Sequence, residues 1–212
     1  MRDLAGAPAA RTVALVGNGP VAPGAEARID AADWVVRFNK ARGFGGRAGS
    51  RIDDLFLVNC GGQMHEWLGD AAFWRSPPVL RAAQVTLPIP AGGAGPGMAR
   101  LRREGMAALD GINFEQDACA RLAHRAGVVR VLPADLQADA VAALAALGPL
   151  RGRWPSTGFL AMAWYDRVLE LDARIVLHGF SFEGYAGHPW PQERAWVEDR
   201  PGRIALAAPV AA

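Results

Sequence analysis

Residues 12–39 read TVALVGNGPVAPGAEARIDAADWVVRFN, and this stretch decides the fold. Its apolar run over 13–16 is uninterrupted, as in a parallel strand buried on both faces. A turn containing Gly17 and Gly19 follows, then a short helix and a second strand over 33–38. The two glycines let the backbone turn sharply and approach a ligand closely, and the start of the next helix would direct free N–H groups at an anion. The stretch therefore predicts a phosphate site.

The second strand ends in Arg37-Phe38-Asn39. These residues fall at the carboxyl edge of the sheet, where open α/β sheets bind their ligands. Asn18 and Asn39 would then reach a nucleotide from two adjacent strand ends, each offering a donor and an acceptor without carrying charge.

The rest of the chain alternates strands with helices, which predicts an α/β fold with a mostly parallel, Rossmann-like sheet flanked by helices. We expect one domain over 1–212, with a flexible N-terminus over 1–11. Residues 90–97, PAGGAGPG, predict either a mobile lid or an exposed linker. The further strands are expected over 54–59, 83–89, 128–132 and 174–177. The further helices are expected over 63–74, ended by Ser76-Pro77-Pro78, over 98–109, 115–126 and 135–147, from Pro155 onward, and after 187–193.

The composition excludes several classes of protein. Of 212 residues, 51% are hydrophobic and the formal net charge is only +2. The arginines are scattered and Lys40 is the only lysine, so we expect no nucleic-acid partner. Cys60 and Cys119 form no CxxC pattern, which suits a reducing compartment. No apolar stretch has the length of a signal peptide or of a membrane span, so we expect a cytoplasmic protein without a transmembrane segment, leaving peripheral membrane contact open.

Three segments together resemble the eukaryotic-type sialyltransferase family, which is glycosyltransferase family 29-like and uses CMP-activated sialic acid. VALVGNGP, followed by IDAADWVVRFNKARGFG and GSR, is similar to the family's large motif. RWPSTGFLAMAW, running into ARIVLHGF, is similar to the small motif with its PSTG signature. HPWPQE is similar to the very small motif, a histidine followed five positions later by glutamate.

The resemblance implies a GT-A-variant fold and an inverting, metal-independent transfer from a CMP-activated sugar, with no other cofactor, to a glycan or glycolipid acceptor. It implies that His188 is the general base and that Glu193 is the acidic end of the very small motif. The nucleotide- and donor-binding residues that it implies are Gly17, Asn18, Gly19, Asn39, Ser156, Thr157 and Gly158.

The sequence also departs from the family's pattern. The motif cysteines that form a disulfide in animal members are absent, as are the membrane anchor and stem, so the chain resembles a short, bacterial-like member. The third motif is not evident, and Tyr185 is the only candidate to assist the departure of the phosphate. The sugar stays open, because CMP-Kdo is chemically close to CMP-sialic acid.

Each implied role has a competing interpretation. His188 has an ordinary pKa near 6.5 and can accept a proton near neutral pH, but it can equally be a surface loop histidine. Ser156 can be an ordinary N-cap. Arg37 can pair with phosphate or with a neighbouring Asp33 or Asp53.

The remaining polar and aromatic residues are interpreted as structural. His65 and His124 are expected to be solvated, and His178 to be a hydrogen-bonded structural histidine or a second catalytic one. The pair Asp53-Asp54 adjoins a buried strand and is expected to be its polar cap, not a metal-binding pair. The expected core tryptophans are Trp67, Trp74, Trp154 and Trp164, whereas Trp190 contacts an acceptor sugar or is buried.

Two other functions compete with the transferase. Gly17, Gly19 and Ala22 satisfy the GxGxxA pattern of an NAD(P)-dependent oxidoreductase. However, the second strand ends without the acidic residue that NAD enzymes keep there, and no Tyr-x-x-x-Lys pair occurs. The chain could also be a non-catalytic, CMP-sugar-binding accessory protein encoded in some operon.

Overall fold

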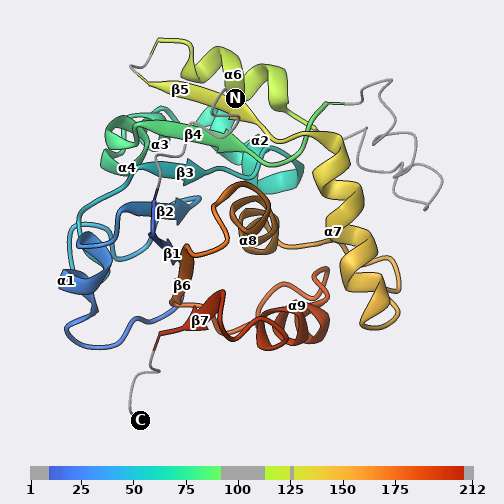
Figure 1. The fold of residues 1–212 in the computed structure, drawn as a ribbon. Helices are drawn as coiled ribbons and strands as arrows, with labels where there is room; N and C mark the ends of the chain where they lie inside the picture. The colour runs from blue at the N-terminus through green and yellow to red at the C-terminus, as the bar shows by residue number, and fades with distance from the viewer. Residues whose placement is uncertain (1–9, 92–112, 125–126, 208–212) are drawn as a thin grey trace.

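The computed structural model describes residues 10–91, 113–124 and 127–207, and in these residues seven parallel strands form a single sheet (Figure 1). The strand order is β5-β4-β3-β2-β1-β6-β7. The strands are β1 Thr12–Val16, β2 Trp34–Phe38, β3 Asp54–Phe56, β4 Gln84–Leu87, β5 Val128–Val131, β6 Arg174–His178 and β7 Ile204–Leu206. The helices are α1 Ala25–Asp30, α2 Gly61–Gly69, α3 Ala71–Trp74, α4 Pro77–Arg81, α6 Glu115–Leu122, α7 Ala134–Ala146, α8 Thr157–Val168 and α9 Trp190–Glu198. The predicted α/β fold is confirmed.

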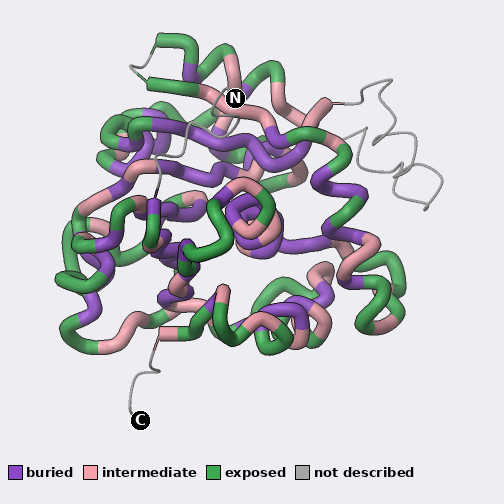
Figure 2. Tube along the Cα trace, in the orientation of Figure 1, coloured by how far each residue is buried: buried purple, intermediate pink, exposed green. Residues whose placement is uncertain are grey.

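Helices cover both faces of the sheet. In β1, Val13 and Leu15 pack into a core with α7, α8 and α9, whereas Ala14 and Val16 pack against α1 on the opposite face. A further core joins β3 and β4 to α2, α3, α4 and α6. Figure 2 shows the resulting pattern, in which the central strands and the inner side of α8 are buried. The uninterrupted apolar run of β1 follows from this two-sided burial.

The direction in which the chain winds changes beside β1. From β1 the chain builds the sheet outward through β2 to β5 on one side, and it then crosses over to place β6 and β7 on the other. The carboxyl ends of β1 and β6 therefore flank a topological switch point, the usual place for a ligand in such a sheet.

Some predicted elements differ in detail. The helix expected over 63–74 is broken at Asp70, whose side chain accepts hydrogen bonds from the amides of Ala72 and Phe73 and so caps a new helix, α3. A helix, α4, begins at Pro77, where we predicted only a break, because proline fits the first turn of a helix. The third strand, expected over 54–59, ends at Phe56.

β7 has no counterpart among the predicted strands. It is three residues long and two of them are exposed, so it lacks the apolar run that marks the inner strands.

Two predictions lie wholly or mostly outside the described residues. They are the lid or linker over 90–97, of which only residues 90 and 91 are described, and the helix over 98–109. Residues 1–9 of the N-terminus expected to be flexible are also outside. Arg11, in contrast, is held in place, since its amide donates to the Asp33 carboxylate at 2.9 Å and its carbonyl accepts from the Arg174 amide at 2.7 Å.

Candidate functional site

The glycine turn contacts the end of β6. The amide of Gly17 donates to the carbonyl of His178 at 2.8 Å, and that of Gly19 donates to the carbonyl of Gly179 at 3.1 Å. A Cβ at Gly17 would lie 2.5 Å from the Gly179 carbonyl oxygen. The two glycines are therefore needed because two backbones touch. The amides of both glycines donate to carbonyls of the protein, whereas the sequence predicted that this turn approaches a ligand.

The helix after this turn does not begin at the turn. α1 begins only at Ala25, is six residues long, and has Gly24 at its N-cap position. In the dinucleotide fingerprint, the helix N-terminus follows the glycines directly and carries the pyrophosphate. This geometry weighs against the oxidoreductase interpretation, and the predicted delivery of helix N–H groups to an anion is not found at this turn.

Asn18 and Asn39 follow the adjacent strands β1 and β2 at the carboxyl edge, as predicted, but both make contacts within the protein. Asn18 Nδ2 donates to the Phe38 carbonyl at 3.1 Å, and its Oδ1 accepts from the Arg42 amide at 2.9 Å. Asn39 has a left-handed backbone with φ 56°, and its Oδ1 accepts from the Val58 amide at 2.9 Å. Its Nδ2 makes no hydrogen bond within the described part of the chain.

The ring of Phe180 joins the glycine turn to the start of α8. It lies 3.3 Å from where a Cβ of Gly17 would be and 2.8 Å from where a Cβ of Gly158 would be. It also packs edge-on against Phe38, with the ring centroids 5.7 Å apart. The ends of β1 and β2 and the first turn of α8 therefore converge on one side chain, and this requires glycine at 158.

Ser156 and Glu193 form a buried pair at the N-terminus of α8. The Ser156 hydroxyl accepts from the Phe159 amide at 3.0 Å and donates to the Glu193 carboxylate at 2.8 Å. The Ser156 amide donates to the other carboxylate oxygen at 2.7 Å. Burial raises the pKa of Glu193 to about 7, although both hydrogen bonds from Ser156 oppose that shift. The serine is thus an N-cap bound to a glutamate, while Thr157 and Gly158 are half-buried.

His188 lies beside the same helix start. Its Nδ1 is 2.8 Å from the carbonyl oxygen of Trp154. A carbonyl only accepts hydrogen bonds, so Nδ1 carries the proton and Nε2 presents its lone pair. The imidazole also contacts the ring edges of Tyr185 and Trp190, with centroids 5.3 and 5.0 Å away. Burial lowers the pKa of His188, and the bond to the carbonyl partly opposes this, so the ring is neutral at pH 7.

Tyr185 is 74% exposed, and no hydrogen bond of its hydroxyl to a described residue is present. Its carbonyl accepts from the indole N–H of Trp190 at 3.0 Å. The contact with His188 keeps Tyr185 near the candidate site, although most of the residue is exposed to solvent.

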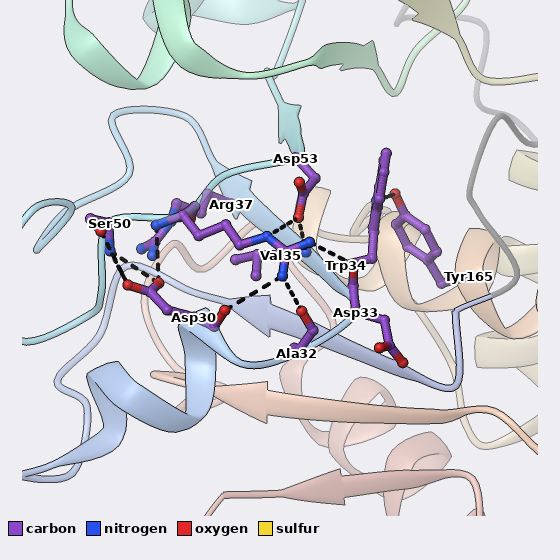
Figure 3. Close-up of polar contacts among 10 residues, drawn as sticks. Asp30, Ala32, Asp33, Trp34, Val35, Arg37, Ser50, Asp53 and Tyr165 are labelled. Atoms are coloured by element: carbon purple, nitrogen blue, oxygen red, sulfur yellow. Dashed lines mark hydrogen bonds and ion pairs between the residues drawn. The ribbon is translucent and has the colours of Figure 1, made fainter.

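Arg37 is fully buried and supports the loop over 40–51. It donates to the carbonyls of Arg51 at 2.8 Å and Ala48 at 2.6 Å, and burial lowers its pKa to about 10. Neither of the predicted partners, Asp33 and Asp53, pairs with it. Figure 3 shows Arg37 together with the polar contacts of Asp30, Ser50 and Asp53.

Arg51, the last residue of the GSR triplet, pairs with the Asp53 carboxylate at 3.0 Å and donates to the Asp33 carbonyl. The Asp30 carboxylate accepts from the amides of Ser50 and Arg51 (Figure 3). The end of the large-motif segment is therefore a loop anchor.

The sequence did not predict the buried carboxylate of Asp54. It was expected to cap a strand, but it is fully buried and accepts from the hydroxyl of Tyr165 at 2.8 Å and that of Thr86 at 2.9 Å. Gln84 donates to it at 2.6 Å, and Arg130 is 4.0 Å away. Burial raises the pKa of Asp54 to about 6. Asp54 begins β3, so this network lies at the amino edge of the sheet, away from the glycine turn.

The predictions for two histidines and three of the four core tryptophans are confirmed. His65 and His124 are exposed, and Trp67, Trp74 and Trp164 are buried, while Trp154 is half-buried against a small core. Among the described residues, no group of three or more His, Cys, Asp or Glu side chains could hold a metal ion. Within the same part of the chain, no helix is long and apolar enough to cross a membrane.

Comparison with known proteins adds two relationships. No protein-family model matches the chain. The urease operon 23 kDa accessory protein of Rhizobium meliloti (strain 1021) is 32% identical over 202 residues, which cover 89% of this chain and 88% of that protein.

Two solved structures have a similar fold. The crystal structure of a mammalian sialyltransferase superimposes with a TM-score of 0.53 and 16% identity, covering 93% of this chain and 68% of that one. A mammalian sialyltransferase in complex with Gal-beta-1-3GalNAc-ortho-nitrophenol gives a TM-score of 0.51, also with 16% identity, covering 93% and 69%. At this identity the likeness establishes the fold.

Proposed function

The chain belongs to the family of the urease operon 23 kDa accessory protein and has a sialyltransferase-like fold, and from this premise we propose that it is a CMP-sugar-dependent glycosyltransferase. It transfers a sialic acid or a related ulosonic acid such as Kdo to a glycan or glycolipid hydroxyl. The transfer inverts the anomeric centre and uses no metal. The protein acts in the cytoplasm as a single domain.

The position of His188 carries this proposal. The Trp154 carbonyl fixes the tautomer with Nε2 unprotonated, and burial lowers the pKa so that the base is neutral near pH 7. A positioned general base contributes about 10² to 10⁴ in rate.

The reaction needs one proton transfer and one displacement. The acceptor hydroxyl oxygen bonds to the anomeric carbon while the bond from that carbon to the phosphate oxygen breaks, and CMP leaves as an anion. The hydroxyl proton moves to Nε2 of His188. Because the donor is already activated, the protein has to position it and stabilise the departing phosphate.

In this account the donor is held at the carboxyl edge of the sheet. Asn39 Nδ2 has no hydrogen-bond partner among the described residues, and Thr157 and Gly158 lie in the first turn of α8, where backbone N–H groups and the helix dipole favour an anion. Ser156 has a positioning role in this account, since its hydroxyl and amide are bound to Glu193.

A second candidate is a non-catalytic accessory protein that binds a CMP-sugar or a partner protein. It is favoured by the relative named as a urease operon accessory protein, and by the engagement of Asn18 and Ser156 in contacts within the protein. In this reading the fold of a transferase serves binding alone.

Donor turnover separates the two candidates. Purified protein is first screened by thermal shift against CMP, CDP, UDP and NADP, and is then incubated with CMP-sialic acid or CMP-Kdo while released CMP is measured. Stabilisation by CMP with slow donor hydrolysis supports the transferase. Stabilisation by CMP with no release from either donor supports the binding protein, and stabilisation by NADP alone rejects both.

A further inference from the structure

His178, the last residue of β6, is a buried titratable group that the proposed reaction does not use. It is 4% exposed, no hydrogen bond of its ring is present among the described residues, and neither ring nitrogen is among the fully enclosed side-chain atoms that lack a partner. The sequence left open a hydrogen-bonded structural histidine or a second catalytic one, and the described residues provide no hydrogen-bond partner that would support the first. The ring lines a cavity, so a ligand there can act as its hydrogen-bond partner.

His178 lines a cavity of about 460 Å³ at the carboxyl ends of β1, β6 and β7. The loop over 19–22 forms one wall, the segment over 177–182 another, and Leu206 and Ala207 close the side. This is the switch point between β1 and β6, where open α/β sheets bind ligands. The size suits a small molecule.

The charges around the cavity are positive. Arg194, on α9, lines it and donates through Nη2 to the Ser181 carbonyl at 2.9 Å. Its Nε and Nη1 make no hydrogen bond to the described residues. Arg28 of α1 and Arg37 of β2 add positive potential at His178; together with burial, the largest cause, they lower the pKa of its ring. The described lining contains no Asp or Glu.

We propose that this cavity binds a small phosphate-bearing anion, with His178 donating a hydrogen bond to it at the floor and Arg194 pairing with it at the rim. Gly19 belongs both to the cavity and to the glycine turn. The anion is therefore either the phosphate of a bound nucleotide or a separate small phosphate. In the first case the inference rests on the proposed function, and His178 assists the departure of the phosphate.

The test combines calorimetry with NMR of the four histidine rings. Inorganic phosphate and CMP are titrated into the wild type and three variants of the full chain. His178→Gln removes the imidazole, and exposed Arg194→Gln removes the rim charge without changing the core. Arg174→Gln is the matched control, because it removes the same charge from the exposed amino end of the same strand.

Phosphate is expected to bind the wild type and Arg174→Gln equally. It should bind the other two variants about 10- to 100-fold more weakly, because each has lost one hydrogen bond to a charged group. Bound phosphate should also raise the pKa of His178 in ¹⁵N spectra, because a nearby anion favours the imidazolium. If His178→Gln does not fold, Arg194→Gln and the NMR titration still decide the question.

Competition between phosphate and CMP distinguishes the two sources of the anion. If phosphate displaces CMP and both require His178, the anion is the nucleotide phosphate; if both bind together, it is a separate molecule. Phosphate that leaves the His178 resonances unchanged, or that binds all variants equally, would overturn the inference. If phosphate raises the pKa of His178 in a protein that neither binds CMP nor releases it from a donor, the proposed function is rejected. The phosphate site itself is then still supported.

Discussion

Glu193 accepts two hydrogen bonds from Ser156, one from its amide at 2.7 Å and one from its hydroxyl at 2.8 Å, and this pair attaches α9 to the first turn of α8. His188 meets the same region through the Trp154 carbonyl. The predicted small and very small motif segments are therefore joined at two points, and His188 is held by a scaffold that includes a buried acid.

The first prediction concerns the pH dependence of that acid. Its folded pKa, about 7, is above its ordinary value of 4.5, so the folded state keeps the proton over a range in which the unfolded chain has lost it. Stability therefore falls as the pH rises from 4.5 to 7. We expect Glu193→Gln to gain stability relative to the wild type across this window, by at most roughly 3 kcal/mol. Urea unfolding at several pH values measures the difference, and a difference independent of pH would contradict the account.

A second prediction concerns the hydroxyl of Tyr165. It donates to Asp54 and accepts from the indole N–H of Trp34 at 2.8 Å, so Tyr165→Phe removes a partner from the buried Asp54 carboxylate and from the half-buried Trp34 indole. We expect a loss of about 1–3 kcal/mol for each group. The hydroxyl lowers the pKa of Asp54, so the loss should be larger at pH 8 than at pH 5.

The same substitution at an exposed position is the control for this prediction. Tyr185→Phe removes a hydroxyl that has no described partner, and it should leave the free energy of unfolding unchanged at either pH. Equal effects of the two substitutions would show that the Asp54 network does not contribute to stability.

The third prediction tests why glycine occupies position 17. In Gly17→Ala the new Cβ would lie 2.5 Å from the Gly179 carbonyl oxygen, which is backbone and cannot rotate away. We expect the variant to unfold at a clearly lower temperature or to be insoluble, since strained core substitutions cost about 1–3 kcal/mol or more. Gly62→Ala, within α2 and with open space around it, should be neutral or stabilising by up to about 1 kcal/mol. Similar melting temperatures for the two variants would refute the close approach of β1 and β6.

Much of the fold could be predicted because its signals are local. The apolar runs of β1, β2 and β6 are each long enough to mark a buried strand, and the alanine-rich pattern of α7 marks a helix. β7 has no such run, and a proline that stops one helix can start the next, as Pro77 does.

The site was harder to predict, because the residue types that bind ligands also hold a protein together. The pattern of Gly17 and Asn18 is the same whether the residues approach a phosphate or a neighbouring strand. The partners that decide between these readings are distant in sequence: Ser156 and Glu193 are 37 residues apart, and Asp54 and Tyr165 are 111 apart. The hydrophobic periodicity of a single segment cannot predict contacts between residues so distant in sequence.

The central claim is that the Nε2 atom of His188 accepts the acceptor's proton, and the most direct measurement compares the transfer rate of His188→Ala with that of the wild type, using CMP-sialic acid or CMP-Kdo. The account predicts a rate lower by about 10² to 10⁴, unchanged CMP affinity, and no effect of His65→Ala at an exposed helix position. A His188→Ala variant that transfers sugar at the wild-type rate would contradict it.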